Sequence, residues 1–396
     1  MRQLESFQFE FNLKTKTKFG VRTATNLGRY LKELSFRKIG IIIDPRVYSL
    51  EYMKEILENI KEEGFSKVKT WEYNLNAEPD YDSLDQIKLY FLDRNSKPVV
   101  DCLVGIGGGS AIDFAKGLST LMANPGKAIT YRGFPTNIKP SLPTIAVPTT
   151  AGTGSEVTYN AVFIDLKDKK KLGINTMYNF PVLAILDPLL TLSCPKSVTV
   201  SSGMDALVHT LESYAACQSN PLTKIFAKEA FNLIFNNLHK VLDDPKNIEI
   251  RANLQLGAYL AGISLMNSGS GPAGALSYPL GVHFKVPHGL AGAVFLPYIV
   301  KHNVKKGYDY GELYDLIENT DKSINGKEKN QLFPKKLVEL CNKLGVPSTL
   351  RVFNVDENNI GILLEETEHL DKAFAQNPIP FLVEDGKRLL MKMIEY

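Results

Sequence analysis

The chain has 396 residues, of which 44% are apolar and 22% are charged, a composition typical of globular proteins with two or three domains. Its net charge of +3 gives no reason to expect a nucleic-acid partner, and no run of about 18 apolar residues predicts a membrane span. The four cysteines form no C-x-x-C pair, which argues against a zinc knuckle or a thioredoxin motif. The first residues form no apolar signal region, so we expect a cytoplasmic protein without membrane partners.

The first half of the chain alternates short β-rich runs with longer segments of helical periodicity. In chain order we expect a strand at 38–44, a helix at 50–64, a strand at 68–73, a helix at 83–95, a strand at 99–105, a helix at 111–122 and a short apolar run at 141–148. Strands and helices that alternate at this spacing predict a parallel sheet covered by helices.

The pattern changes near residues 186–188, after which helical periodicity dominates and β-branched runs are scarce. Helices are expected at 202–217, 222–242, 248–266, 335–344 and from 382 onward, and the polar stretch 321–331 is expected to be a surface loop. We therefore predict an α/β nucleotide-binding domain over 1–187 and an all-helical domain for metal and substrate over 188–396.

A glycine-rich turn follows the buried strand expected at 99–105. Glycines at such a point let the backbone approach a pyrophosphate, and the N-terminus of the next helix attracts negative charge. The candidate contacts are Gly107, Gly108, Gly109 and Ser110. Ser110 stands where the dinucleotide fingerprint has its last glycine, so a plain strand-to-helix turn is the alternative. Asp113 and Lys116, one helical turn apart, could orient the cofactor or pair with each other.

A second loop, 148–156 (PTTAGTGSE), is dense in hydroxyls and glycines and follows the apolar run at 141–148. Its backbone amides, with Thr149 and Thr150, could hold phosphate or ribose oxygens. A helix N-cap with a capping acid is the alternative interpretation, and both can hold at once.

Asp44 ends the strand expected at 38–44. An acid at this point can bind a ribose 2′-hydroxyl and repel a 2′-phosphate, which favours NAD over NADP. The alternative is an acid that opens a turn before Pro45. Arg46 weakens the discrimination, because it could pair with a phosphate, so NADP stays possible.

The candidate metal ligands are an acid and two imidazoles. Asp205 and His209 lie four residues apart in an expected helix and therefore share one of its faces. His288 follows far downstream between a proline and a glycine, and His283 is a spare ligand. One carboxylate with two imidazoles suits a divalent metal such as Fe(II) or Zn(II), with positions open for substrate.

Together these motifs strongly resemble the iron-containing (group III) alcohol dehydrogenase family. The matching segments are 101–116 (DCLVGIGGGSAIDFAK), 148–158 (PTTAGTGSEVT), 184–188 (AILDP), 203–212 (GMDALVHTLE) and 287–289 (PHG). The resemblance implies an N-terminal Rossmann-like domain and a helical C-terminal domain in a dehydroquinate synthase-like architecture. It also implies that Asp44, Thr149, Thr150 and Lys171 add cofactor contacts, and that Asp205, His209 and His288 are three of the four family metal ligands.

The chain departs from the family pattern at two positions. Gly274 stands where the family has its third metal-binding histidine, and Tyr278 stands where the family often has a second histidine near the substrate. Three outcomes are open: the three remaining ligands hold a metal with an extra water, His283 moves in, or the site is metal-free. In the last case Tyr278 or His288 would polarise the carbonyl or donate the proton.

The expected function is reversible hydride transfer between a primary alcohol or aldehyde and a nicotinamide cofactor, in a homodimer. The alternatives are a dehydroquinate-synthase-like lyase, a metal-free reductase and a nucleotide-binding relative without turnover. The lyase would need a denser basic pocket, for which Lys285 is an isolated candidate. A Tyr in the run Ser-Tyr-x-Leu-Gly, as at Tyr278, also resembles family branches that act on sugar acids, which hints at a polyhydroxylated substrate.

Overall fold

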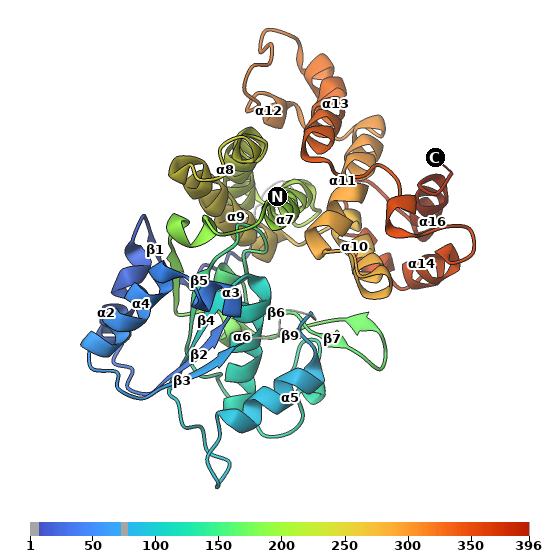
Figure 1. The fold of residues 1–396 in the computed structure, drawn as a ribbon. Helices are drawn as coiled ribbons and strands as arrows, with labels where there is room; N and C mark the ends of the chain where they lie inside the picture. The colour runs from blue at the N-terminus through green and yellow to red at the C-terminus, as the bar shows by residue number, and fades with distance from the viewer. Residues whose placement is uncertain (1–7, 73–77, 396) are drawn as a thin grey trace. The chain divides into compact units, whose positions relative to one another are not determined.

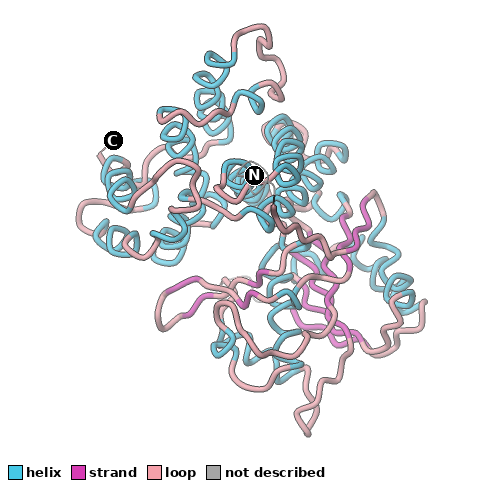
Figure 2. The backbone as a smooth tube through the Cα atoms, turned by 180° about the vertical axis from the view of Figure 1, so that it is seen from behind, coloured by secondary structure: helices cyan, strands magenta, loops and turns pink. Residues whose placement is uncertain are grey.

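The computed structural model describes residues 8–72 and 78–395, which form two compact units (Figures 1 and 2). One unit is Leu13–Pro195 and is built around a parallel sheet; the other is Lys196–Tyr396 with the described residues that precede Leu13, and is helical. The predicted fold class, an α/β domain followed by a helical domain, is confirmed. The division lies a few residues beyond the expected boundary, because Leu190, which follows that boundary, still packs in the core of the first unit.

The sheet of the first unit has six parallel strands in the order β1-β10-β5-β4-β2-β3. The strands are β1 (Lys16–Phe19), β2 (Ile39–Ile43), β3 (Val68–Glu72), β4 (Cys102–Gly107), β5 (Thr144–Pro148) and β10 (Leu183–Leu186). β2 and β4 are buried throughout, which explains why their sequences are continuous apolar runs rather than alternating ones.

Helices cover both faces of this sheet. Ile41 packs in one core with α2 (Leu27–Glu33) and α4 (Glu51–Glu62), whereas the next residue, Ile42, packs in another with α5 (Tyr81–Tyr90) and α6 (Gly109–Ala123). Successive side chains of a strand point to opposite faces, so one apolar strand serves both cores. Two short hairpin-like pairs complete the unit: β6 (Asn160–Ala161) with β9 (Ile174–Asn175), and β7 (Ile164–Asp165) with β8 (Lys170–Lys171).

The strand order reverses between β2 and β4. The chain runs from β2 outward to β3 and then returns to place β4 on the other side of β2. Ligands of open α/β sheets bind beyond the carboxyl ends of the strands at such a reversal. Asp44, directly after β2, and Gly107, the last residue of β4, lie side by side there, since the N–H of Asp44 donates to the carbonyl of Ile106 at 3.0 Å.

The second unit is a set of packed helices. Its longer members are α7 (Lys196–Ala215), α8 (Pro221–Asn237), α9 (Ile248–Ser268), α10 (Pro272–Phe284), α11 (His288–Lys305), α13 (Gly326–Leu344), α14 (Ile360–Thr367) and α16 (Val383–Lys392). The expected loop at 321–331 is wrong in its second part, because the Asn325 side chain caps α13 by accepting from the N–H of Glu328 at 3.0 Å. Among the described residues, no helix is both long and apolar enough to cross a membrane.

Candidate functional site

Asp205, His209 and His288 come together in the helical unit. Asp205 and His209 lie one turn apart on α7, and His288 is the first residue of α11. Oδ1 of Asp205 lies 3.7 Å from Nε2 of His209 and 3.9 Å from Nε2 of His288. One ligand atom from each residue lies within 4.8 Å of the other two. Ligand atoms about 2.0–2.2 Å from a shared ion lie roughly 3–4 Å apart, so this cluster has metal-site dimensions.

Gly289 allows α11 to approach α7 this closely. A Cβ on Gly289 would lie 2.0 Å from the carbonyl oxygen of Ser201 and 2.7 Å from Cβ of Asp205. Any side chain there would force the two helices apart and carry His288 away from Asp205. The glycine of the Pro-His-Gly run is therefore part of the geometry of the cluster.

Two residues of the cluster carry buried polar groups. Nδ1 of His209 is buried and has no hydrogen-bond partner among the residues that the structure describes. Asp205 is buried as well. A buried carboxylate beside two imidazoles fits a divalent metal that keeps open coordination positions, and Nε2 of His209, 3.7 Å from Oδ1 of Asp205, is the nitrogen of that ring that faces the cluster.

Gly274 lies at the start of α10, against the buried carboxylate of Glu212. Glu212 accepts hydrogen bonds from the N–H of Ala273 at 2.6 Å, from the N–H of Gly274 at 3.2 Å and from Oγ of Ser270 at 2.8 Å. Burial raises the pKa of the Glu212 carboxyl to about 7, and these hydrogen bonds oppose the rise. Sequence reasoning missed this helix cap, although Glu212 follows Asp205 by seven residues and so shares its helix face.

His283 does not join the cluster. Its Nε2 lies 3.9 Å from Oε1 of Glu366, and among the residues that the structure describes the candidate ligands that gather at one point are Asp205, His209 and His288. His283 is in the last turn of α10, before the left-handed residue Lys285 ends the helix. The chain reverses between His283 and His288, so their nearness in sequence does not bring them to one point.

Tyr278 stacks on the imidazole of His288, with ring centroids 5.1 Å apart and planes 14° apart. The neighbouring Ser277 lies 3.0 Å from Nδ1 of the same imidazole. The structure therefore brings Tyr278 to the metal cluster, as the resemblance implied. Ser277 was not expected, because a serine in a helical run carries no sequence signal of its own.

The two loops of the expected cofactor site meet at the carboxyl edge of the sheet. The N–H of Thr149 donates to the carbonyl of Gly107 at 2.9 Å, and a Cβ on Gly108 would lie 3.4 Å from Oγ1 of Thr150. Gly109 begins α6 with Ser110 next to it, and a Cβ on Gly109 would clash with Thr153 at 2.6 Å. Backbone N–H groups at this helix start, with the hydroxyls alongside, suit a pyrophosphate.

Asp113 and Lys116 pair with each other, their closest atoms 3.4 Å apart, and both anchor the second loop. Asp113 accepts from Oγ of Ser155 and from the N–H of Val162, and Nζ of Lys116 donates to the carbonyls of Ser155 and Thr158. Burial lowers the pKa of Lys116, which is fully enclosed, and the Asp113 carboxylate opposes that shift. These contacts favour the pairing alternative for Asp113 over a direct cofactor contact.

The neighbouring Glu156 is fully buried in the same loop. Burial raises the pKa of its carboxyl to about 7, while its own backbone N–H and the nearby Lys116 lower it. An enclosed acid and an enclosed lysine therefore hold the loop between β5 and β6. No side-chain cap is formed at the start of the short helix at Ser155–Val157, so the capping alternative is not realised there.

Asp44 and Lys171 each meet a charged partner. Asp44 caps the short helix α3 (Pro45–Tyr48) through the N–H of Arg46 at 2.8 Å, and its carboxylate also pairs with the Arg46 guanidinium at 3.0 Å. Lys171, on β8, forms an ion pair with Glu78 at 2.9 Å. The turn alternative noted for Asp44 is therefore realised as the start of a short helix, and Arg46, noted as a possible partner of a phosphate, pairs with Asp44 itself.

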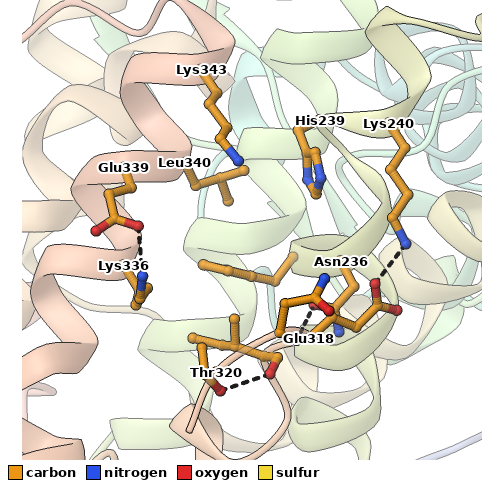
Figure 3. A pocket seen from close by; sticks show the side chains of 12 residues that line it. Asn236, His239, Lys240, Glu318, Thr320, Lys336, Glu339, Leu340 and Lys343 are labelled. Atoms are coloured by element: carbon orange, nitrogen blue, oxygen red, sulfur yellow. Dashed lines mark hydrogen bonds and ion pairs between the residues drawn. The ribbon is translucent and has the colours of Figure 1, made fainter.

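A pocket of about 220 Å³ lies elsewhere in the helical unit, between the end of α8, the loop at 317–320 and α13 (Figure 3). Lys240 pairs with Glu318 and Lys336 pairs with Glu339 in its wall, each at 2.8 Å. None of its lining residues belongs to the metal cluster. We therefore assign this pocket no part in the chemistry.

Two family descriptions match the chain. "Iron-containing alcohol dehydrogenase" matches residues 14–188, and "Fe-containing alcohol dehydrogenase family, C-terminal" matches residues 199–394. The two matches together span both structural units.

Individual relatives agree with these matches. The chain is 30% identical to long-chain-alcohol dehydrogenase 1 of Geobacillus thermodenitrificans, covering 90% of this chain and 89% of that one. It is 31% identical to the NAD-dependent methanol dehydrogenase of Bacillus methanolicus, covering 92% and 94%. A crystal structure of a 1,3-propanediol oxidoreductase superposes with a TM-score of 0.89 at 26% identity, covering 98% of this chain and 100% of that one.

Proposed function

The chain belongs to the iron-containing alcohol dehydrogenase family, and we propose that it transfers a hydride reversibly between a primary alcohol or aldehyde and the nicotinamide of NAD. The observation that carries the metal-dependent form of this proposal is the cluster of Asp205, His209 and His288, with ligand atoms within 4.8 Å of one another. The glycine turn after β4 supports the nucleotide part. The redox chemistry itself belongs to the cofactor, and the protein supplies binding and orientation.

Each residue of the cluster has a role in this proposal. Asp205, His209 and His288 would hold one divalent ion, which when bound supplies Lewis-acid polarisation of the substrate oxygen. Tyr278, stacked on His288, would present its hydroxyl to the substrate as a hydrogen-bond donor. Gly289 keeps His288 against α7, so that the three ligands stay in one place.

The glycine turn and its neighbours would hold the dinucleotide. Gly107, Gly108 and Gly109 let the backbone approach the pyrophosphate, and Ser110, Thr149 and Thr150 would donate hydrogen bonds to it. The Asp44 carboxylate, beyond β2, would bind the ribose 2′-hydroxyl and so favour NAD over NADP. Lys171 stays a more distant candidate, since its ammonium already pairs with Glu78.

The substrate class rests on what the relatives are named for. Relatives are named for methanol and for 1,3-propanediol, both of which are primary alcohols, so a primary alcohol is our proposal for this chain. Tyr278 in place of a histidine favours a polyhydroxylated member of that class. A homodimer, expected from the family resemblance, belongs to the same proposal and is tested by sedimentation at several concentrations.

The competing functions make different demands on the site. A dehydroquinate-synthase-like lyase would need several cations for a phosphate-bearing substrate, and the exposed Lys285 alone is a weak basis for that. A metal-free reductase would work through Tyr278 and His288, and a relative without turnover would only bind the nucleotide. No specific contact favours either over the metal-dependent enzyme.

The test is metal loading followed by turnover. Protein purified without oxygen is soaked in Fe(II), Zn(II) or Mn(II), its metal content is measured by mass spectrometry, and NADH formation is followed with a panel of primary alcohols. We expect about one ion per chain and turnover that depends on it, with both lost in Asp205→Ala. Turnover without bound metal would move the mechanism to Tyr278 and His288. Nucleotide binding without turnover on any alcohol would contradict the proposal.

A further inference from the structure

The hydroxyl of Ser277 makes two hydrogen bonds with one proton to give. Its Oγ lies 2.6 Å from the carbonyl oxygen of Gly274 and 3.0 Å from Nδ1 of His288. A carbonyl oxygen can only accept, so at 2.6 Å the proton of the hydroxyl must lie between Oγ and Gly274. Oγ is then left as an acceptor toward His288, and Nδ1 of that ring must carry the proton of this second bond.

We propose that Ser277 is a positioning residue that holds His288 as its Nδ1–H tautomer, so that Nε2 presents its lone pair to the metal. This inference rests on the proposed function, because it assigns Nε2 of His288 to the ion. Nε2 already lies 3.9 Å from Oδ1 of Asp205, on the side of the ring that faces the cluster. The tautomer of a metal-binding histidine is set by what its other nitrogen binds.

The residues around Ser277 keep its two hydrogen bonds in place. Ser277 is fully buried, so no water competes for its hydroxyl. Tyr278 stacks on the imidazole with planes 14° apart, which restrains the plane of the ring. Glu212 anchors the first turn of α10 and thereby the carbonyl of Gly274 to which Ser277 donates.

The hydrogen bond from His288 to Ser277 matters more in this chain because Gly274 stands where a further metal ligand was expected. With three protein ligands, each lone pair must already point at the ion, since a histidine in the other tautomer would present N–H to it. Outer partners of metal-binding histidines contribute roughly 10–100-fold in metal affinity. We expect Ser277 to contribute in that range.

The test compares Ser277→Ala with a matched control, Ser268→Ala. Ser268 is a buried serine of α9 whose hydroxyl also donates to a carbonyl of its own helix, that of Ser264, at 2.8 Å. Both variants lose one buried hydroxyl of this kind, but only Ser277→Ala touches His288. Thermal unfolding of both shows that they remain folded. Ser277→Thr, which keeps the hydroxyl, serves as the rescue variant.

The first readout is the tautomer of His288, measured from the ring nitrogen shifts of metal-free protein labelled with ¹⁵N-histidine and assigned with His288→Ala. At pH 8, where an ordinary imidazole is neutral, wild type and Ser268→Ala should show a protonated Nδ1. Ser277→Ala should shift toward protonated Nε2. An Nε2–H tautomer in wild type, or an unchanged Nδ1–H tautomer in Ser277→Ala, overturns the inference whatever the metal does.

The second readout is Zn(II) affinity by competition with a chromogenic chelator. Ser277→Ala should bind Zn(II) about 10–100-fold more weakly than wild type, with Ser277→Thr nearer wild type and Ser268→Ala unchanged. Equal affinity in wild type and Ser277→Ala overturns the inference while the proposed function stands. If wild type itself binds no Zn(II), Fe(II) or Mn(II), the metal-dependent function fails, and the positioning role toward a metal is overturned with it.

Discussion

Gly274 lies directly against Glu212. The N–H of Gly274 donates to Oε2 of Glu212 at 3.2 Å, and a Cβ on Gly274 would come within 2.9 Å of the same oxygen. The position at which a ligand histidine was expected therefore has no space for a side chain unless a buried, hydrogen-bonded carboxylate moves. A side chain at position 274 is therefore excluded by the way α7 packs against α10, because Glu212 of α7 fills the space that it would need.

Gly274→Ala should destabilise the protein by about 1–2 kcal/mol, although alanine is ordinarily the better helix former. The reason is the clash of the new Cβ with Oγ of Ser270, at 2.6 Å, and with Glu212. Urea unfolding measures the free energy of unfolding of Gly274→Ala, Ser270→Ala and the double variant. The double variant should recover part of the loss, because the nearest clashing atom is gone.

Gly274→His should not raise Zn(II) affinity, and a tenfold gain would contradict this account.

His209→Ala should weaken metal binding by more than the roughly 10–100-fold cost of losing an outer partner, because it removes a direct ligand. His283→Ala is the matched control, since His283 lies beside Glu366 and outside the cluster. Metal content after dialysis against a weak chelator separates the two. A loss of metal in His283→Ala equal to that in His209→Ala would show that His283 does move in.

The buried Glu156 should make stability depend on pH. Burial raises the pKa of its carboxyl from 4.5 to about 7 in the folded chain. The stabilisation is therefore complete below pH 4.5 and is lost as the pH rises through 7, because the unfolded chain releases the proton first. Relative to Glu156→Gln, wild type should lose roughly 2–3 kcal/mol of unfolding free energy between pH 5 and pH 8.

Denaturant unfolding at the two pH values measures this difference. Glu33→Gln at the exposed end of α2 is the control, and its difference from wild type should be the same at both pH values. A wild-type loss no larger than that of Glu156→Gln would mean that Glu156 is not protonated in the folded chain below pH 7.

Gly108→Ala should separate nucleotide binding from folding. The backbone of Gly108 is extended, with φ −71°, and a Cβ there would make only an ordinary 3.4 Å contact with Thr150. The methyl group would nevertheless stand where the proposed nucleotide site brings the pyrophosphate to the backbone. We expect a melting temperature near that of wild type and NADH affinity weaker by about tenfold, or ~1.4 kcal/mol, in a fluorescence titration.

Gly105→Ala is the contrasting variant, because its Cβ would lie 2.9 Å from Cα of Ile112 inside the core. It should lower the melting temperature clearly. Unchanged NADH affinity in Gly108→Ala would remove the glycine turn from the nucleotide site.

Asp44→Ser should shift the cofactor preference toward NADP. Serine can still cap α3 through its hydroxyl, but the carboxylate that would repel a 2′-phosphate is gone and Arg46 loses its partner. The ratio of kcat/KM with NADP to that with NAD should rise by about tenfold or more, equivalent to ~1.4 kcal/mol or more. Asp44→Asn, which keeps the cap and removes only the charge, should shift the ratio the same way. No shift in either variant would mean that Asp44 does not contact the ribose.

Local periodicity accounts for much of what could be predicted. The buried runs at β2 and β4, the glycine turn and the Asp205–His209 pair all follow from rules that act within a few residues, so they are readable from the sequence. The loop expected at 321–331 was wrong because Asn325 starts a helix inside a polar stretch, where apolar periodicity is weak. His288 was a candidate from its place between a proline and a glycine, and the resemblance implied it as a ligand, but it lies too far along the chain for any local rule to place it beside Asp205.

The sequence by itself therefore determined the alternation of strands and helices in the first half, the helical character of the second half and the chemical types available at the two sites. Only the tertiary structure decided which side chains meet: Glu212 with Gly274, Ser277 with His288, Asp113 with the loop it anchors, and His283 with Glu366 instead of the metal cluster. The physical reason is that periodicity sets direction within one helix or strand, whereas these contacts depend on how closely distant elements pack. That closeness is set by single atoms, such as the missing Cβ of Gly289.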